Sequence, residues 1–383
     1  MDLFDDLPEP SYGKDVGGKA EPNKLGAAKN MTLTNAEDVD NTCKSDGKRK
    51  LSEDDTQNKK KRVEHATYKL RGFVAEHQGE RDEMQDAHVL IDDWTSRFIS
   101  LDPSILQLSL YAVMDGHGGK RASRFASESL PLNLREKFPK GDTSRVMSDI
   151  KRCFIEAYKK TDEDFLKEAA KNKPAWKDGT TAISAVCVND AVYVANLGDS
   201  KAVLCRYNEE EKRCVGIPLS QDHSPSAYEE RLRIQKAGGH VKNGRVMGVL
   251  EVSRSIGDGQ YKTFGVTCLP DVKKCQLKDK DRFLLIGCDG LWKSFSIQES
   301  IEFIEQQLNK CGDTAGRETD AKFQAACNKL VSEAVLRLSA DNVTVILVRI
   351  QKTRRNTGDV TCLCERHRLC VFGDVQVSIR HLL

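Results

Sequence analysis

Residues 110–119 read LYAVMDGHGG and join an apolar run to a short polar, glycine-rich segment. Five mostly apolar residues run directly into Asp115, which is followed by Gly116, His117 and two further glycines. An apolar run of this kind is typical of a buried strand, and an Asp-Gly pair after a strand is usually a turn. Similar endings recur along the chain, however, and the recurrence favours a shared site over a set of unrelated turns.

Further aspartates border apolar runs in the same way: Asp86 in ERDEMQDAHVL, Asp199 in VANLGDSKA, Asp289 in LLIGCDGLW and Asp341 in SADNVTVIL. Carboxylates held together in a partly buried site repel each other unless a cation neutralises them. Because these donors are hard oxygen ligands, Mg²⁺ or Mn²⁺ fits better than zinc or copper. Gly116 permits a close backbone approach and can offer its carbonyl oxygen as a ligand. The strand is therefore expected to deliver the Asp115 carboxylate to a metal site.

Two such ions, about 3.5–4 Å apart, can share a carboxylate and lower the pKa of a bridging water. This arrangement suits phosphoryl hydrolysis, in which the ions neutralise charge on the phosphate oxygens. The reaction also needs a cation for the phosphate and a proton donor for the leaving oxygen, and Arg81 and His117 can fill these roles. The pattern thus favours a hydrolase that uses Mg²⁺ or Mn²⁺ for phosphoryl hydrolysis.

The composition limits the other functions. The chain has 383 residues, enough for one large domain or two ordinary ones. Its 60 basic and 58 acidic residues leave a net charge of +2, which argues against nucleic acid or membrane as a partner of the whole chain. No apolar run could span a bilayer, and the acidic start MDLFDDLPEP resembles no secretory signal. The 13 scattered cysteines indicate reduced thiols in the cytosol or nucleus.

Residues 1–66 are polar and lack apolar periodicity, so we expect them to be disordered. Between Lys48 and Arg62 they carry two basic clusters separated by eight residues. These clusters predict recognition by a nuclear-import receptor and a protein shared between cytoplasm and nucleus, while a solvated charge run is the alternative.

Residues 67–351 contain the apolar periodicity of a folded domain. Expected strands lie at 73–77, 87–91, 107–114, 181–188, 191–197, 202–207, 282–287 and 343–350. Expected helices lie at 120–137, 145–171, 227–237, 297–309 and 320–337. Asn189 and Asp190 close an antiparallel hairpin, and hairpins mixed with long helices predict an α+β fold. The remaining residues, 352–383, form an irregular tail whose Cys362, Cys364, His367 and Cys370 match no established zinc spacing.

As an ordered set, several motifs between residues 68 and 349 resemble those of the metal-dependent type 2C protein serine/threonine phosphatases. They are ERDEMQDAH, AVMDGHGG, KDGTTA, NLGDSKAVL, ERLRIQKAGGHV, GRVMGVLEVSRSIGDGQYK, CDGLW and SADNVTV. The resemblance implies a four-layer αββα sandwich of two antiparallel sheets flanked by helices, and phosphoserine or phosphothreonine proteins as substrates. The stretches AWKDGTTA, LCRYNEE and YEERLRIQKAGG resemble a branch of this family that is linked to integrin-linked kinase. This kinase is therefore an expected partner. We expect a monomer.

The resemblance also implies a metal-binding role for each candidate ligand. Asp115 would bridge the two ions, and Gly116 would add its carbonyl oxygen. Asp289 and Asp341 would bind one ion, whereas Asp86 would lie on the acidic side of the other.

Further roles implied by the resemblance concern the substrate and the rim of the site. Arg81 would bind the phosphate and His117 would act as the general acid. Asp199 would bind a third, weaker ion, and Thr181 would line the site. Residues 224–262 would form a flap beside the site that influences the choice of substrate.

Two positions depart from the family pattern. Gln85 stands where many members have Glu, so an amide replaces a carboxylate near one ion. Lys293 stands where many members have Asp, four residues after Asp289, and its charge would weaken a third ion by repulsion. These departures leave open a catalytically weak phosphatase fold that acts as a phosphoprotein-binding module.

Two other functions have partial support in the sequence. A cysteine-dependent phosphatase needs an Arg six positions after the thiolate, and Cys311 and Arg317 have that spacing. Cys43 and Cys362 have the same spacing to an Arg within the tails, so chance accounts for it, and Cys311 follows a helical pattern rather than a strand. A nucleic-acid binder would rest on the basic clusters alone, which lack interleaved aromatic residues.

Overall fold

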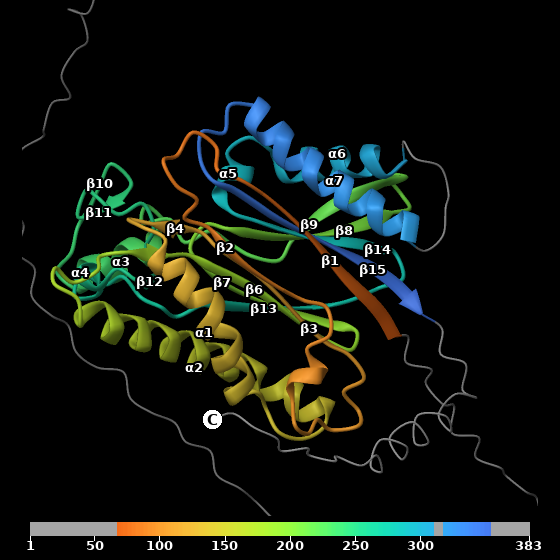
Figure 1. Ribbon diagram of the computed structural model, residues 1–383, viewed down its shortest axis with the longest axis horizontal. Coiled ribbons are helices and arrows are strands. Elements are labelled where there is room, and N and C mark those ends of the chain that lie inside the picture. Colours follow the sequence, from red (N-terminus) through yellow and green to blue (C-terminus); the bar gives the residue numbers. More distant parts are fainter. Residues whose placement is uncertain (1–66, 310–316, 354–383) are drawn as a thin grey trace, which may run out of the picture. The chain divides into compact units, whose positions relative to one another are not determined.

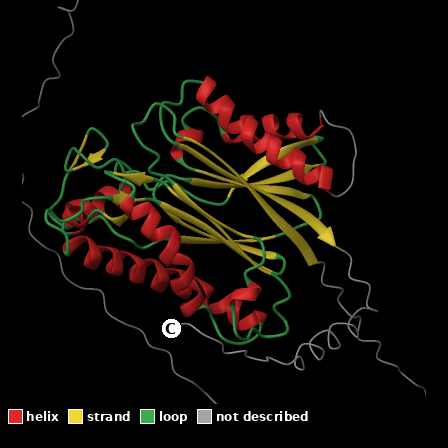
Figure 2. Cartoon of the chain, viewed as in Figure 1, coloured by secondary structure: helices red, strands yellow, loops and turns green. Residues whose placement is uncertain are grey.

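The computed structural model describes residues 67–309 and 317–353. The import clusters, Cys311, the N-terminal region and nearly all of the C-terminal tail lie outside this part, so the expectations for them stay predictions. Two five-stranded sheets stack face to face with helices on both outer faces (Figure 1; Figure 2). All strand pairs within these sheets are antiparallel. The expected α+β, four-layer αββα sandwich is therefore confirmed.

The first sheet has the order β1-β15-β14-β8-β9 and the second β13-β7-β6-β3-β2. The strands of the first are β1 (Thr67–His77), β15 (Val343–Thr353), β14 (Asp281–Gly287), β8 (Lys201–Asn208) and β9 (Arg213–Pro218). Those of the second are β13 (Asp271–Gln276), β7 (Ala191–Leu197), β6 (Ala182–Val188), β3 (Leu108–Met114) and β2 (Ala87–Ile91). A small third sheet joins β12 (Ile256–Gly257), β5 (Gly179–Thr180) and β4 (Gly116–His117).

Strand β3, which precedes Asp115, is buried along its whole length because both of its faces meet apolar layers. Leu110 and Met114 point to the helices on the outer face of the second sheet, while Tyr111 and Val113 point into the layer between the two sheets. The alternation of side chains along a strand explains why the sequence shows a continuous apolar run here instead of an apolar–polar pattern. Burial on both faces holds the end of β3, and thus Asp115, in a fixed position.

The long helices cover the sheets in pairs. Helices α1 (Arg121–Lys137) and α2 (Thr143–Ala170) pack on the second sheet, and α6 (Ile297–Asn309) and α7 (Arg317–Leu336) pack on the first (Figure 1). The Asp142 carboxylate caps α2 by accepting a 2.9 Å hydrogen bond from the Arg145 N–H. Within the described residues, none of the helices combines the length and apolar character needed to cross a membrane.

Two edge strands, β13 and β9, were not expected from the sequence. β13, with the sequence DVKKCQ, pairs with β7 through its backbone although most of its side chains face solvent. β9 pairs with β8 at the edge of the first sheet, and its short apolar run of Cys214, Val215 and Ile217 is interrupted by Gly216. The predicted hairpin is confirmed, since β6 pairs with β7 and Asn189 takes a left-handed backbone conformation with φ of 53°.

The expected flap is a small structural unit with its own apolar cluster. It contains α3 (Tyr228–Lys236), β10 (Val241–Lys242), β11 (Arg245–Val246) and α4 (Gly259–Lys262). The cluster joins Ile234, Val246, Leu250, Val252 and Val266, so the unit extends beyond the expected boundary at residue 262. The end of the flap is thus set by packing of Val266 rather than by the last motif residue.

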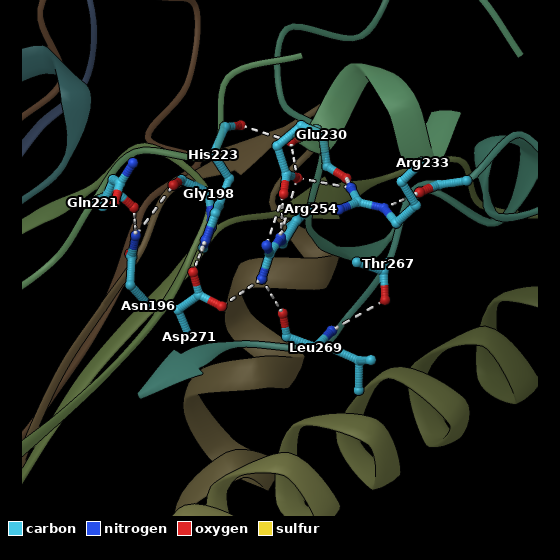
Figure 3. A network of polar contacts seen from close by, with 12 residues as sticks. Asn196, Gly198, Gln221, His223, Glu230, Arg233, Arg254, Thr267, Leu269 and Asp271 are labelled. Carbon is cyan, nitrogen blue, oxygen red and sulfur yellow. Dashed lines mark hydrogen bonds and ion pairs between the residues drawn. The ribbon is translucent and has the colours of Figure 1, made fainter. Parts of the chain in front are cut away.

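Polar contacts join the base of the flap to the second sheet (Figure 3). Arg254 contacts Glu230 with Nη2 at 2.7 Å from Oε1, and its Nη1 lies 2.9 Å from Asp271 Oδ1 at the start of β13. His223 extends the network, with Nε2 3.0 Å from Asp271 Oδ2 and Nδ1 accepting a 3.1 Å hydrogen bond from the Gly198 N–H. The network fixes the flap beside the turn that carries Asp199.

Candidate active site

A cavity of about 360 Å³ opens at one end of the two sheets, and the predicted site residues converge on it. Those that line it are Arg81, Asp115, Gly116, His117, Thr181, Asp199, Asp289 and Asp341. Asp86 lies behind this wall and is only 7% exposed. The structure thus brings all the candidates together, although Asp86 and Asp341 come from opposite ends of the folded domain in the sequence.

Asp115 follows β3 directly, and its backbone is held on both sides. Its carbonyl oxygen accepts hydrogen bonds of 2.9 Å from the Thr181 N–H and the Thr180 hydroxyl. Its own N–H donates to the Thr181 hydroxyl oxygen at 3.3 Å. Thr181 therefore lines the cavity and also fixes the backbone from which the Asp115 carboxylate projects.

Asp86 is a buried carboxylate with one unsatisfied oxygen. Oδ2 accepts a 2.7 Å hydrogen bond from the Thr344 hydroxyl, whereas Oδ1 has no partner among the described residues. Burial, with a further contribution from the negative charges of Asp289 and Asp341, raises the pKa of Asp86 to about 6. A buried oxygen without a partner is costly, so this position calls for a donor or a cation.

The neighbouring carboxylates show the same need for positive charge. Oxygens of Asp115, Asp199 and Asp289 lie within 4.8 Å of one another, and Asp86, Asp115 and the Cys288 thiol form a second group of this size. Burial and then the charges of Asp86 and Asp289 raise the pKa of Asp115 well above its usual range. Burial and the charge of Asp289 raise the pKa of Asp199 to about 6. Oxygen donors at this density fit a divalent cation such as Mg²⁺ or Mn²⁺.

The second residue of the opening motif, Gly116, lies against the loop that carries Asp86. A side chain at Gly116 would collide with the Gln85 carbonyl oxygen and the Ser123 hydroxyl. The Gln85 side-chain amide donates a 3.1 Å hydrogen bond to Glu83 Oε1. The glycine therefore allows the β1–β2 loop and β4 to approach closely enough for Asp86 and Asp115 to face each other.

Cations contact the outer carboxylates of the cavity. The Lys293 ammonium lies 2.6 Å from Asp289 Oδ2 and 2.8 Å from Asp341 Oδ2, and Arg81 Nη2 lies 2.9 Å from that same Asp341 oxygen. Burial alone would raise the pKa of Asp341, but the hydrogen bond and charge of Lys293, together with Arg81, lower it below its usual value. Asp341 is thus neutralised by the chain itself, in contrast to the deeper Asp86 and Asp115.

His117 pairs with a carboxylate that sequence reasoning missed. Its Nε2 lies 2.6 Å from Oδ2 of Asp258, whose side chain is 2% exposed. Burial opposes protonation of the ring, but the charge and hydrogen bond of Asp258 outweigh it and raise the pKa of His117. The imidazole is thereby stabilised in its protonated form, which is the form a general acid requires.

Asn342 is a second residue that sequence reasoning missed, although it lies inside the quoted SADNVTV motif. Its side-chain amide donates to the carbonyl oxygens of Gln78 at 2.7 Å and Glu83 at 3.2 Å. Its amide oxygen accepts a 2.8 Å hydrogen bond from the Gln85 N–H. One buried side chain therefore ties the whole β1–β2 loop, with Arg81 and Asp86, to the start of β15.

A two-sheet sandwich with a cluster of carboxylates at its end is the arrangement of a metal-dependent hydrolase, and a family model identifies the family. Residues 70–343 match the model described as Protein phosphatase 2C. The chain belongs to this family and is a metal-dependent protein serine/threonine phosphatase.

Within the family, the chain is similar to the integrin-linked kinase-associated serine/threonine phosphatase 2C of several mammals. It is 48% identical to that protein of Bos taurus over 369 residues, which cover 91% of this chain and 100% of the relative. For the Homo sapiens protein the identity is 49% over 364 residues, covering 91% and 93% of the two chains.

Solved structures have the same fold. A Caenorhabditis elegans sex determining protein superposes with a TM-score of 0.61 at 25% identity and covers 77% of this chain and 67% of that one. A serine-threonine phosphatase 2C from Toxoplasma gondii gives a TM-score of 0.60 at 21% identity, with 73% and 94% covered.

Proposed function

We propose that this phosphatase hydrolyses phosphoserine and phosphothreonine in signalling proteins with two bound Mg²⁺ or Mn²⁺ ions. Asp115, Asp289 and Asp341 would hold the ions together with the Gly116 carbonyl, and Asp86 would lie beside the second. When bound, such ions neutralise phosphate charge and lower the pKa of water. The proposal is carried by one observation. Several carboxylates meet beside an open cavity, and among the described residues the buried Asp86 Oδ1 has no hydrogen-bond partner.

The chain's own residues would orient the substrate and supply the proton. Arg81 offers a guanidinium at the cavity rim, with a side chain 58% exposed, where it would bind the phosphate oxygens. His117 would protonate the leaving serine or threonine oxygen. Because Nε2 contacts Asp258, the proton for the leaving oxygen would come from Nδ1.

Hydrolysis of a phosphothreonine peptide by the purified, chelator-treated chain, with Mn²⁺ or Mg²⁺ titrated back, tests this proposal. We expect activity only with added metal and no loss after thiol alkylation, because the mechanism uses no cysteine nucleophile. A folded sample that stays inactive at every metal concentration would support the phosphoprotein-binding module instead. Loss of activity on alkylation would favour a cysteine-dependent reaction.

A partner and a location belong to the same proposal. The name of the mammalian relatives supports association with integrin-linked kinase. The basic clusters between Lys48 and Arg62 support import into the nucleus in addition to a cytoplasmic pool. The protein would act as a monomer. Replacing both clusters in a fluorescent fusion should leave the protein cytoplasmic. Unchanged nuclear entry would remove the import receptor from the proposal.

A further inference from the structure

Lys293 is positioned by the local helix geometry to meet two carboxylates at once. Helix α5 (Asp289–Trp292) begins at Asp289, and Lys293 follows one turn later, with its N–H donating to the Asp289 carbonyl oxygen at 2.8 Å. Side chains four residues apart lie on the same helix face, which accounts for the 2.6 Å contact between Nζ and Asp289 Oδ2. The same ammonium also contacts Asp341, 48 residues further along the chain, which precedes the neighbouring strand β15.

The ammonium approaches the carboxylates from the solvent side. The Lys293 side chain is 50% exposed, compared with 20% for those of Asp289 and Asp341. It lies on Oδ2 of both residues, while Asp341 Oδ1 accepts a 2.9 Å hydrogen bond from the Asn342 N–H. Lys293 therefore covers the outer edge of the cluster and contacts neither of the inner carboxylates, Asp86 and Asp115.

A lysine in this position acts on any divalent ion nearby in two ways. It already neutralises the oxygens that such an ion would use, and its own charge repels the ion at short range. The Asp199 and Asp115 carboxylates lie in one 4.8 Å cluster with Asp289, so without the ammonium these oxygens would offer a further position for a divalent ion. A tethered ammonium, unlike a free ion, cannot be removed by dilution or by a chelator.

We propose that Lys293 is a built-in cation of the active site, which takes the place of a further divalent ion at the outer edge of the cluster, where it contacts Asp289 and Asp341. It limits the number of divalent ions that the site holds and keeps Asp289 and Asp341 together when metal is absent. Lys293 is thus a positioning residue for the two carboxylates. The inference rests on the proposed function, because it assumes that the same carboxylate cluster binds divalent ions.

The first test counts bound Mn²⁺ by equilibrium dialysis with elemental analysis, which does not depend on activity. We expect Lys293→Asp to bind one more equivalent of Mn²⁺ than the wild type. Lys293→Met should reach half-saturation at a Mn²⁺ concentration at least about tenfold lower, and Lys293→Arg should behave as the wild type because it keeps the charge. Equal counts and equal half-saturation in all four proteins would overturn the proposal.

The second test measures thermal unfolding in chelator, where no divalent ion contributes. Lys293→Met should unfold at a lower temperature than wild type, and Lys293→Arg should restore most of the difference. The matched control is Lys352→Met, which removes a lysine 2.6 Å from Asp279, far from the cluster. If Lys293→Met equals wild type in chelator, the ammonium does not hold the carboxylates together and the proposal fails.

The two tests also separate this inference from the proposed function. If the wild type binds Mn²⁺ but hydrolyses no phosphopeptide, the proposed function fails while the differences between the Lys293 variants still decide the present inference. If the wild type is an active metal-dependent phosphatase and the Lys293 variants match it in both tests, only the present inference fails.

Discussion

His117 Nε2 lies 2.6 Å from Oδ2 of the buried Asp258, although the two residues are 141 positions apart in the sequence. Asp258 lies in the segment between β12 and α4, at the base of the flap, whereas His117 belongs to β4 next to Asp115. The flap therefore does more than border the cavity. It supplies the carboxylate that orients the proposed general acid and stabilises its protonated form.

Asp258→Asn should slow the enzyme in a way that depends on the leaving group. The amide keeps the shape of the carboxylate but removes its charge, so the His117 ring loses the group that favours its protonated form. We expect a loss of about 10²-fold in kcat with phosphothreonine peptides and little change with an activated aryl phosphate. Steady-state kinetics on both substrates measures the ratio.

His117→Ala provides the comparison for this experiment. If Asp258 acts through His117, the variant that combines Asp258→Asn with His117→Ala should be no slower than His117→Ala alone. The effects of two residues that act as a pair are not additive. Equal losses on the two substrates, or additive losses in the double variant, would contradict the role given to the pair.

Asp115→Asn should abolish hydrolysis and at the same time stabilise the metal-free protein. Burial and the negative charges of the neighbouring carboxylates both disfavour ionisation of Asp115 and raise its pKa. Replacing it with a neutral isostere relieves this repulsion, and each kcal/mol gained raises the unfolding temperature by roughly 2–4 °C. Phosphopeptide turnover and thermal unfolding in chelator are the two measurements.

Asp190→Asn in the β6–β7 turn is the matched control for Asp115→Asn, since it makes the same substitution away from the cavity. It should leave turnover unchanged and shift the unfolding temperature very little. Near-normal turnover by Asp115→Asn would show that the metal cluster is not the reaction centre.

Asn342→Ala should destabilise the fold and impair catalysis together. Its amide makes hydrogen bonds to Gln78, Glu83 and Gln85 in the β1–β2 loop, and all of them would be lost. At about 1 kcal/mol for each hydrogen bond, we expect a loss of about 3 kcal/mol in the free energy of unfolding. Urea denaturation measures this loss, and kcat/KM should fall because the loop carries Arg81 and Asp86.

Asn328→Ala, on the exposed face of α7, is the control for this change. Substitutions at such exposed positions usually alter stability by less than about 0.5 kcal/mol. If Asn342→Ala were equally mild and fully active, the loop would be held by other contacts and Asn342 would have no special role.

The site residues differ in whether a local sequence pattern marks them. Asp86, Asp115 and Asp289 could be predicted because each lies beside an apolar run whose strand pattern is local. Asp258 and Asn342 could not, because their roles depend on partners at a sequence distance of 141 residues for His117 and 257 for Gln85. No short-range pattern contains such information.

Strand β13 was missed for a different physical reason. Its residues DVKKCQ pair with β7 through backbone hydrogen bonds, which any sequence can form at an edge. Apolar periodicity reports burial of side chains, and the side chains of β13 are mostly exposed. The central strands were recognisable because both of their faces meet apolar layers.

Glu230 should make the stability of the fold sensitive to acid. Although burial opposes its ionisation, hydrogen bonds from Arg254, Arg233 and Ser253 lower its pKa far below the ordinary value of 4.5. A carboxyl group whose pKa is depressed in the folded state stabilises the fold fully above its unfolded pKa, and this contribution is lost as the pH falls toward the folded pKa. The free energy of unfolding should therefore decline below about pH 4.5.

Glu230→Gln isolates this contribution. At pH 7 the variant should be less stable by about 3 kcal/mol, because Arg254, with a side chain only 15% exposed, loses its main counter-charge. Below pH 4.5 the difference from the wild type should shrink, since the wild type loses the same interaction on protonation. Glu229→Gln, at the exposed neighbouring position of α3, should follow the wild-type curve throughout. A gap between Glu230→Gln and the wild type that stays constant from pH 7 to pH 3 would show that ionisation of Glu230 does not stabilise the flap.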